Sequence, residues 1–254
     1  MINKVINIAK EAGEVIRNGF GENIKIEFKT GDNNLVTNID KAAEKTILDF
    51  VKLEYPNHSI IAEESGTERK SSEYTWVIDP LDGTTNFAHG LPIFAVSIGI
   101  QKNNETITGV VYDVMNDKVY AAEKGGGTYV NGYKSSVTKN NSLPESLVVT
   151  GFPYDIKKDL DETVRVFTQF LLKTRGVRRL GSAAIDLCYV SSGVFDAFWE
   201  SGLNPWDVCA GMLLVKEAGG TISNFNGESI NIFANQILAT NGFIHNDMLK
   251  VFNR

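Results

Sequence analysis

The sequence predicts a layered αβαβα sandwich, in which an N-terminal α+β half with an antiparallel sheet and a C-terminal α/β half share one cleft. Two observations lead to this fold class. Up to about residue 140, two helical patterns precede a series of period-two segments, as expected for helices over an antiparallel sheet. Beyond that point, strand-like and helix-like segments alternate, which is typical of an α/β arrangement.

The N-terminal half, residues 1–142, begins with two helices and two short strands. Apolar side chains recur at helical spacing in the helices, and alternation marks the strands. Thr37 or Asn38 can cap the second helix, and Tyr55-Pro56-Asn57 stops it. The predicted elements are helices at 2–20 and 38–54, strands at 24–29 and 58–62, and a polar turn at 30–34.

The sheet continues with a buried-looking strand at 76–78, which is predicted to break at the Asp79-Pro80 turn. Asn131-Gly132 is a strong hairpin signal. Further strands are predicted at 92–102, 105–114 and 117–123, with a pair around the hairpin. Residues 140–144 form the best internal boundary.

The C-terminal half, residues 143–254, shows no long linker, so we expect the two halves to form a single catalytic unit with one core and one cleft. Its predicted elements are strands at 146–150, 176–180, 194–199, 221–224 and 236–240, and helices at 158–172, 182–192, 207–218 and 246–253.

Composition excludes several classes of protein. A net charge of −6 without any Lys/Arg run argues against nucleic-acid binding, and the cluster Arg175, Arg178 and Arg179 is interpreted as a solvated strand edge. The apolar run at 91–100 is too short to span a bilayer, and the N-terminus lacks a signal-peptide pattern. We therefore expect a cytoplasmic protein with no membrane partner. Cys188 and Cys209 are expected to be buried thiols, and three scattered histidines give no support for zinc.

The segment after the strand at 76–78 carries the clearest chemical signal. Asp79 and Asp82 lie three residues apart, and Gly83, Thr84 and Thr85 follow at the start of a predicted helical turn. Magnesium is bound by oxygen ligands, and the free N–H groups of a helix N-terminus bind phosphate. This segment therefore predicts a magnesium-dependent enzyme that acts on phosphate groups.

Other carboxylates also stand at the ends of predicted elements, where α/β proteins place their sites. Glu63 and Glu64 follow a strand, Asp207 begins a helix, and Asp40 lies in the first turn of another. Each has a structural alternative: Asp40 and Asp207 as helix caps, Glu63-Glu64 as a solvated pair, and 79–82 as a simple turn. Two carboxylates about 5 Å apart repel by roughly 3 kcal/mol at an effective dielectric near 20. Convergence of all of them would therefore require bound cations, but spacing alone does not establish it.

Four blocks of sequence resemble the inositol monophosphatase family, and specifically its bacterial inositol-1-monophosphatase-like members. These are metal-dependent and typically lithium-sensitive phosphomonoesterases. The similarity covers nearly the whole chain, and the blocks occur in the family's order. They are residues 35–40, 61–65, 76–87, and 204–211 with 217–220.

The resemblance implies roles for individual residues. Two or three Mg²⁺ ions are expected, bound by Glu63, Asp79, the Leu81 carbonyl, Asp82 and Asp207. Catalysis is expected to involve Glu63 and a Thr84–Asp40 pair that orients and deprotonates water. Glu64 is expected behind the ligands, and Lys29 beside a weaker metal position. Substrate contacts are expected from Asp82, Gly83, Thr84, Thr85, Gly181, Ser182, Ala183, Glu200 and Asp207.

Substrate identity is less constrained. Inositol 1-phosphate is favoured, because the Glu200 carboxylate can accept hydrogen bonds from two adjacent hydroxyl groups, with Ala183 beside it. Residues 150–154 are expected near the mouth of the cleft. The 2′-phosphate of NADP and fructose 1,6-bisphosphate are alternatives within the family, and a regulatory or binding role is the alternative outside enzymology. A homodimer acting on a small phosphorylated metabolite is expected by resemblance.

Overall fold

The computed structural model describes residues 1–22, 26–28, 35–153 and 155–252. The predicted polar turn at 30–34, Lys29 and both ends of the strand predicted at 24–29 lie outside the described residues. The α-helices are α1 Ile2–Gly19, α2 Asn38–Glu54, α3 Thr84–Ala88, α4 Leu160–Lys173, α5 Ala183–Ser191, α6 Pro205–Glu217 and α7 His245–Phe252, with short 3₁₀ helices at Leu143–Glu145 and Ile156–Lys158.

The strands form three sheets. β1 Ile26–Phe28 and β2 Leu35–Thr37 pair as a short ribbon. The large sheet contains β3 Ser59–Ala62, β4 Gly66–Glu68, β5 Tyr74–Asp82, β6 Ala95–Lys102, β7 Glu105–Asp113, β8 Lys118–Glu123, β9 Gly127–Val130 and β10 Tyr133–Ser135. The small sheet contains β11 Leu147–Thr150, β12 Gly176–Arg178, β13 Ala197–Ser201, β14 Thr221–Ser223 and β15 Gln236–Thr240.

The two main sheets differ in strand direction. Across the described residues, the large sheet has eight strands in the order β10-β9-β8-β7-β6-β5-β3-β4 and is antiparallel except where β3 meets β5. The small sheet has five in the order β12-β11-β13-β15-β14, and β11 runs parallel to both of its neighbours. An antiparallel sheet followed by a mixed α/β sheet is the predicted fold class.

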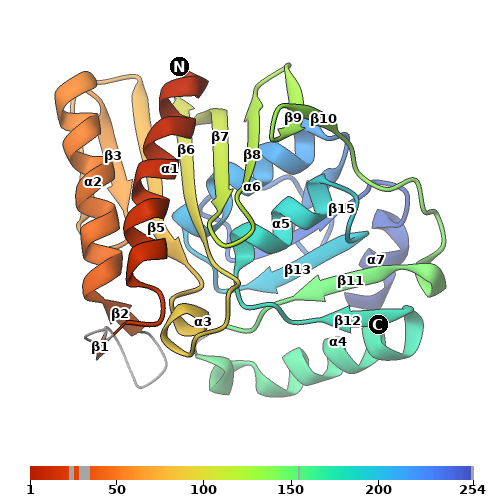
Figure 1. The fold of residues 1–254 in the computed structure, drawn as a ribbon. Coiled ribbons are helices and arrows are strands. Elements are labelled where there is room, and N and C mark those ends of the chain that lie inside the picture. The colour runs from red at the N-terminus through yellow and green to blue at the C-terminus, as the bar shows by residue number, and fades with distance from the viewer. Residues whose placement is uncertain (23–25, 29–34, 154, 253–254) are drawn as a thin grey trace.

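Helices separate and cover the sheets in five layers (Figure 1). α1 and α2 cover one face of the large sheet, and α5 and α6 lie between its other face and the small sheet. α4 and α7 cover the outer face of the small sheet. The alternation of side chains along β5 explains this order, because Trp76 and Ile78 join the core under α1 and α2 while Val77 joins the core around α5 and α6. The layered αβαβα prediction is therefore confirmed.

Glycines allow α6 to approach the large sheet closely. A Cβ atom built at Gly109 would lie 2.8 Å from the carbonyl oxygen of Ala210, and one at Gly99 would overlap the sulfur of Cys209. Because helix packing distance depends on the size of the residues at the contact, these two positions set the depth at which α6 sits. They also fix the position of Asp207, in the first turn of that helix.

The predicted break of the strand at Asp79-Pro80 is wrong. β5 continues to Asp82, and its pairing with β6 shifts between Asp79, opposite Ser97, and Asp82, opposite Ala95. Three steps on β5 thus match two steps on β6, which is the geometry of a β-bulge. Pro80 is tolerated there because a bulge leaves one residue without a ladder hydrogen bond.

Most other predicted elements are present with boundaries shifted by one to three residues. The helix predicted from Asp207 starts at Pro205 instead, because proline favours the first helical position and Asn204 takes the capping position. The three-residue strands β2 and β4 were not predicted, since so short a segment carries almost no periodic signal. Cys188 and Cys209 are buried free thiols, as predicted. Within the described residues, no helix combines the length and apolarity needed to cross a bilayer.

Candidate active site

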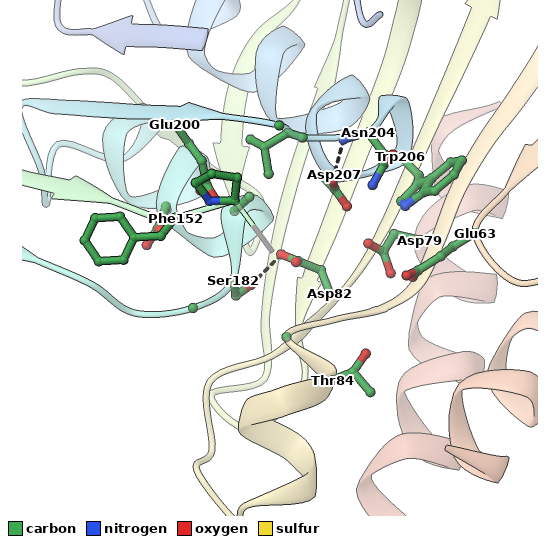
Figure 2. A pocket seen from close by; sticks show the side chains of 18 of the residues that line it. Glu63, Asp79, Asp82, Thr84, Phe152, Ser182, Glu200, Asn204, Trp206 and Asp207 are labelled. Carbon is green, nitrogen blue, oxygen red and sulfur yellow. Dashed lines mark hydrogen bonds between the residues drawn. The ribbon is translucent and has the colours of Figure 1, made fainter. Parts of the chain in front are cut away.

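A cavity of about 220 Å³ opens where the end of β5 meets the first turns of α3, α5 and α6 (Figure 2). Residues 151–153, which follow β11, and Glu200 on β13 line its other side. Both halves of the chain therefore contribute to one cavity. Strand ends and helix N-termini face it, which is where α/β folds place ligands.

Four carboxylates converge at one end of this cavity: Glu63, Asp79, Asp82 and Asp207 (Figure 2). One carboxylate oxygen from each of Asp79, Asp82 and Asp207 lies within 4.8 Å of the others. Glu63 follows β3 and interacts directly with the Asp79 carboxyl. The convergence that spacing alone left open is therefore present in the structure.

Burial and mutual repulsion raise the pKa of these carboxyls. Burial, followed by the charges of Glu63, Asp82 and Asp207, raises the pKa of Asp79 well above its ordinary value. Burial raises the pKa of Asp82 to about 6, and burial together with the charge of Asp82 raises the pKa of Asp207 to about 8. Several carboxyl oxygens placed together in this way suit a hard cation such as magnesium.

Asp82 links β5 to the N-terminus of α5. Its Oδ2 atom accepts hydrogen bonds of 2.6 Å from the Ser182 hydroxyl and 2.7 Å from the Ala184 N–H. Ser182 is the N-cap of α5, and its hydroxyl oxygen also accepts a hydrogen bond from the Ile185 N–H. The predicted substrate-contact segment 181–183 is thereby held directly against a predicted metal ligand.

Asp207 has a structural function as well as a place in the cavity. Its Oδ2 atom accepts a hydrogen bond of 2.6 Å from the Asn204 N–H, as part of a capping box at the start of α6. The alternative that Asp207 caps the helix is therefore partly right. Asp207 belongs to the capping box, but it is the third helical residue, and Asn204 occupies the cap position. One carboxylate oxygen orients the side chain, and a carboxylate has further lone pairs available for a ligand.

Asp40 has a similar double position. Its Oδ2 atom accepts hydrogen bonds from the N–H (2.9 Å) and the hydroxyl of Thr37 in the capping box of α2. Its Oδ1 atom accepts a hydrogen bond of 2.9 Å from the Thr84 hydroxyl. Burial raises the pKa of Asp40 above its ordinary value, although these hydrogen bonds oppose the shift. The structure therefore brings together the two residues expected to pair.

The backbone between Asp79 and Thr84 turns sharply into α3. The Leu81 side chain is buried in the core, and its carbonyl oxygen accepts a hydrogen bond of 3.1 Å from the Thr84 hydroxyl. Gly83 has a φ of +100°, and a Cβ there would lie 2.8 Å from the Ile93 carbonyl oxygen. α3 has only five residues, so its dipole is small. The N–H groups of its first turn are therefore the main hydrogen-bond donors that this helix N-terminus offers to an anion.

The opposite end of the cavity is formed by the predicted substrate-contact residues. Gly181, Ser182, Ala183 and Glu200 all line it, together with residues 151–153. Burial, then the charge of Asp207, raises the pKa of Glu200 to about 8. Of the segment 150–154 predicted at the cleft mouth, residues 151–153 border the cavity; Thr150 is buried and does not line it, and residue 154 lies outside the described residues.

Three of the predicted site residues that the structure describes do not line the cavity: Thr85, Glu64 and Asp40, which contacts it through Thr84. Thr85 is exposed on α3 and does not line it, because the helical turn directs the residue after Thr84 to another face. Glu64 is half-buried, and its N–H donates a hydrogen bond of 2.8 Å to Glu44 Oε2.

Several cavity residues were given no role in the site from the sequence, among them Arg179, Asp186 and Trp206. The basic cluster is exposed beside the edge strand β12, as interpreted from the sequence, and Arg179 in addition borders the cavity, with its guanidinium 6.0 Å from the Phe152 ring centre. Asp186 could have been found, because it lies one helical turn after Ser182 and therefore on the same face of α5. Trp206 precedes Asp207 in the first turn of α6 and lines the cavity (Figure 2).

Comparison with known proteins identifies the family. A sequence model described as the inositol monophosphatase family matches residues 1–254. The chain belongs to the inositol monophosphatase family. It is therefore a phosphatase, a phosphoric monoester hydrolase of a metal-dependent family whose substrates are small phosphorylated molecules.

Individual inositol monophosphatase relatives align over almost the full chain. "Nus factor SuhB" of Escherichia coli K12 is 41% identical, over 98% of this chain and 94% of the relative. "Fructose-1,6-bisphosphatase/inositol-1-monophosphatase" of Aquifex aeolicus is 40% identical, over 98% of this chain and 96% of the relative. The solved Thermotoga maritima IMPase is 37% identical with a TM-score of 0.92, covering 99% of this chain and 96% of that one. These similarities support the αβαβα fold described above.

Proposed function

We propose that the protein is a magnesium-dependent phosphomonoesterase that hydrolyses inositol 1-phosphate, or a related small phosphate monoester, without a phosphoenzyme. The observation that carries this proposal is the convergence of carboxylates beside an oriented hydroxyl in one cavity. Asp79, Asp82 and Asp207 lie within 4.8 Å of one another, and the Thr84–Asp40 hydrogen bond adjoins them. Phosphoryl transfer to water requires three components: ligands for a cation, a group that orients the water, and hydrogen-bond donors to the phosphate.

The carboxylates are the proposed metal ligands, together with the Leu81 carbonyl. The residues present suit Mg²⁺, since all the donors are oxygen atoms and the carboxyls repel one another without a cation, and two or three ions per subunit are part of the proposal. Magnesium, when bound, supplies the positive charge that activates water and stabilises the leaving oxygen. Glu63 interacts with the Asp79 carboxyl and would also be a ligand of the magnesium ion. Lys29 and Glu64 would support this end of the site.

Gly83 and Thr84 are the proposed phosphate-binding residues, through their backbone N–H groups at the first turn of α3. The Thr84 hydroxyl donates to Asp40, so its oxygen can accept a hydrogen bond from an attacking water. The raised pKa of Asp40 favours its accepting the proton that is passed through Thr84.

The alcohol part of the substrate is proposed to lie between Gly181, Ser182, Ala183 and Glu200, with Asp82 and Asp207 close to the ester. Glu200 can accept hydrogen bonds from hydroxyl groups. Because β5 supplies one end of the cavity and α5 with β13 the other, we propose that residues 1–142 and 143–254 act as one catalytic unit. A homodimer, a cytoplasmic location and inhibition by lithium are part of the same proposal.

A different substrate and a second role are the competing possibilities. The Aquifex relative carries both fructose 1,6-bisphosphatase and inositol monophosphatase in its name, and NADP 2′-phosphate is a further candidate. A regulatory or binding role is supported by the name of the relative called a Nus factor.

A substrate panel tests the proposal. Phosphate release is measured from inositol 1-phosphate, NADP, fructose 1,6-bisphosphate, histidinol phosphate and 3′-phosphoadenosine 5′-phosphate, with magnesium, with EDTA, and with magnesium plus lithium. The expected result is magnesium-dependent release that is fastest with inositol 1-phosphate and is inhibited by lithium. Faster release from another ester would replace the proposed substrate, and no release from any of them would favour the regulatory role.

A further inference from the structure

Asp186 is a buried acid with no assigned purpose in the proposed mechanism. It lies on α5, is 1% exposed and lines the cavity. Its Oδ1 atom has no hydrogen-bond partner. Within the described residues, the only other buried side-chain nitrogen or oxygen without a partner is Nε1 of Trp206, which lines the same cavity. Since buried polar groups in folded proteins are almost always paired, both atoms mark the cavity as a place where a ligand completes the hydrogen bonding.

Glu200 is a second acid that lines the cavity, although its carboxylate oxygens are not among the fully buried atoms without a partner. It is 9% exposed, and in the described part of the chain no donor is hydrogen-bonded to its carboxylate. Gly151 packs against the carboxylate so closely that a Cβ atom there would overlap both oxygens. The glycine therefore permits the carboxylate to lie against the backbone at this end of the cavity.

Asp186 and Glu200 line the same cavity, and the Glu200 charge acts on Asp186. The Glu200 charge, after burial itself, raises the pKa of Asp186, and Arg179 acts in the opposite direction on both residues. Leaving a buried polar group without a hydrogen-bond partner costs free energy, and the cost is larger for a charged group. A ligand that brings two hydrogen-bond donors would remove this cost.

The kind of ligand follows from the surrounding charges. Arg179 borders the cavity and already places one positive charge near both acids. Hydroxyl groups donate hydrogen bonds without adding a second positive charge. α5 also orients Asp82 through Ser182. A hydroxyl bound at Asp186 is therefore held at a fixed position relative to Asp82, where the phosphate is proposed to bind.

We propose that Asp186 is a specificity-determining residue that accepts a hydrogen bond from a second hydroxyl of the leaving alcohol, adjacent to the hydroxyl bound by Glu200. The site thereby selects esters of polyols, with the two donors on neighbouring carbons. This inference rests on the proposed function for the identity of the reaction. It adds Asp186 as the acceptor of the second hydroxyl, a residue to which the proposed function gives no role.

Kinetics with two esters test the role of Asp186. Inositol 1-phosphate carries the hydroxyls, and phenyl phosphate has the same reacting group without them. Asp186→Ala and Asp186→Asn are expected to lower kcat/KM for inositol 1-phosphate at least tenfold relative to kcat/KM for phenyl phosphate, mainly through KM. Glu200→Gln is expected to shift this ratio in the same direction. Equal losses with both esters would overturn the proposal, because they would indicate a purely structural role.

Asp113→Asn is the matched control. Asp113 is also a fully buried aspartate, but it ends β7 away from the cavity and accepts hydrogen bonds from the N–H and side chain of Asn116. This variant is expected to lose stability while keeping the ratio between the two esters. A change of the ratio as large as that of Asp186→Asn would overturn the assignment.

Binding of free myo-inositol separates this inference from the proposed function. Saturation-transfer NMR is recorded with magnesium and no phosphate ester, so the readout does not depend on turnover. Signal transfer in the wild type that is lost in Asp186→Ala supports the inference, even if the wild type releases no phosphate and the proposed function fails. Unchanged transfer in Asp186→Ala, or stronger transfer to an amino alcohol such as ethanolamine, overturns the inference even if the phosphatase activity is present.

Discussion

The Thr84 hydroxyl donates a hydrogen bond of 2.9 Å to Asp40 Oδ1, and this contact joins the first turn of α3 to the first turn of α2. The other oxygen of Asp40 is held by Thr37. Asp40 therefore cannot rotate away without breaking the capping box, and Thr84 is oriented before a substrate binds. Preorganisation of this kind is what general base catalysis through a hydroxyl requires.

Replacing the hydroxyl tests this relay. Thr84→Val keeps the shape of the side chain, and we expect it to lower kcat by roughly 100-fold or more, the range for loss of a proton-transfer group. Thr84→Ser keeps the hydroxyl and should retain most of the activity. Steady-state kinetics of both variants with inositol 1-phosphate, beside their melting temperatures, provides the measurement. A kcat for Thr84→Val within about threefold of the wild type would show that the hydroxyl has no part in the chemistry.

The raised carboxyl pKa values make the metal-free protein sensitive to pH. The pKa of Asp82 lies near 6 and those of Asp207 and Glu200 near 8 in the folded state, so the folded protein keeps protons that the unfolded chain loses near pH 4. These groups therefore contribute most to the free energy of unfolding below about pH 4, and this contribution is lost as the pH rises to about 8. We expect the melting temperature in EDTA to decrease by several degrees between pH 5 and pH 8.5.

Magnesium should reverse this trend, since it replaces the protons on the same carboxyls. The increase in melting temperature on adding magnesium is expected to be small at pH 5 and to grow towards pH 8.5. Differential scanning calorimetry with EDTA and with magnesium across this range measures both curves. Parallel curves, with the same magnesium effect at every pH, would contradict the assignment of these carboxyls as the cation site.

The close packing of α6 on the large sheet predicts a link between stability and metal binding. Gly109→Ala places a methyl group 2.8 Å from the Ala210 carbonyl oxygen, and overpacking of this kind destabilises a fold by about 1–3 kcal/mol. Because α6 carries Asp207, we also expect weaker magnesium binding by isothermal titration calorimetry. Gly13→Ala crowds Tyr112 on the opposite face of the sheet and should destabilise the fold without changing magnesium affinity. Equal magnesium affinity in both variants would show that the packing of α6 on the sheet does not affect magnesium binding.

Much of the architecture could be predicted from the sequence because the elements are amphipathic and well bounded. α2 was expected at 38–54 and occupies those residues, since Thr37 caps it and Pro56 follows its end. The path of β5 through Pro80 could not be predicted, because a bulge depends on how β6 pairs with it and not on local propensity. The same holds for β4, whose three exposed residues become a strand only beside β3.

The candidate site was likewise predicted only in part from the sequence. Asp79 and Asp82 were found from their spacing, and the Thr84–Asp40 pairing came from the family resemblance and not from the residues alone. Asp186 was missed although its spacing from Ser182 places it on the same face of α5, and its position in one cavity with Glu200 depends on tertiary packing. Tertiary packing, rather than local pattern, determines which side chains face the cavity.

Asp82→Asn tests the central claim, that the converging carboxylates bind magnesium and make phosphate release possible. The amide keeps an oxygen that can accept the Ser182 and Ala184 hydrogen bonds, so the melting temperature in EDTA should change little. The measurement is phosphate release from inositol 1-phosphate at saturating magnesium by this variant and by the wild type. We expect release by Asp82→Asn to be lower by several orders of magnitude, and near-normal turnover would contradict the account.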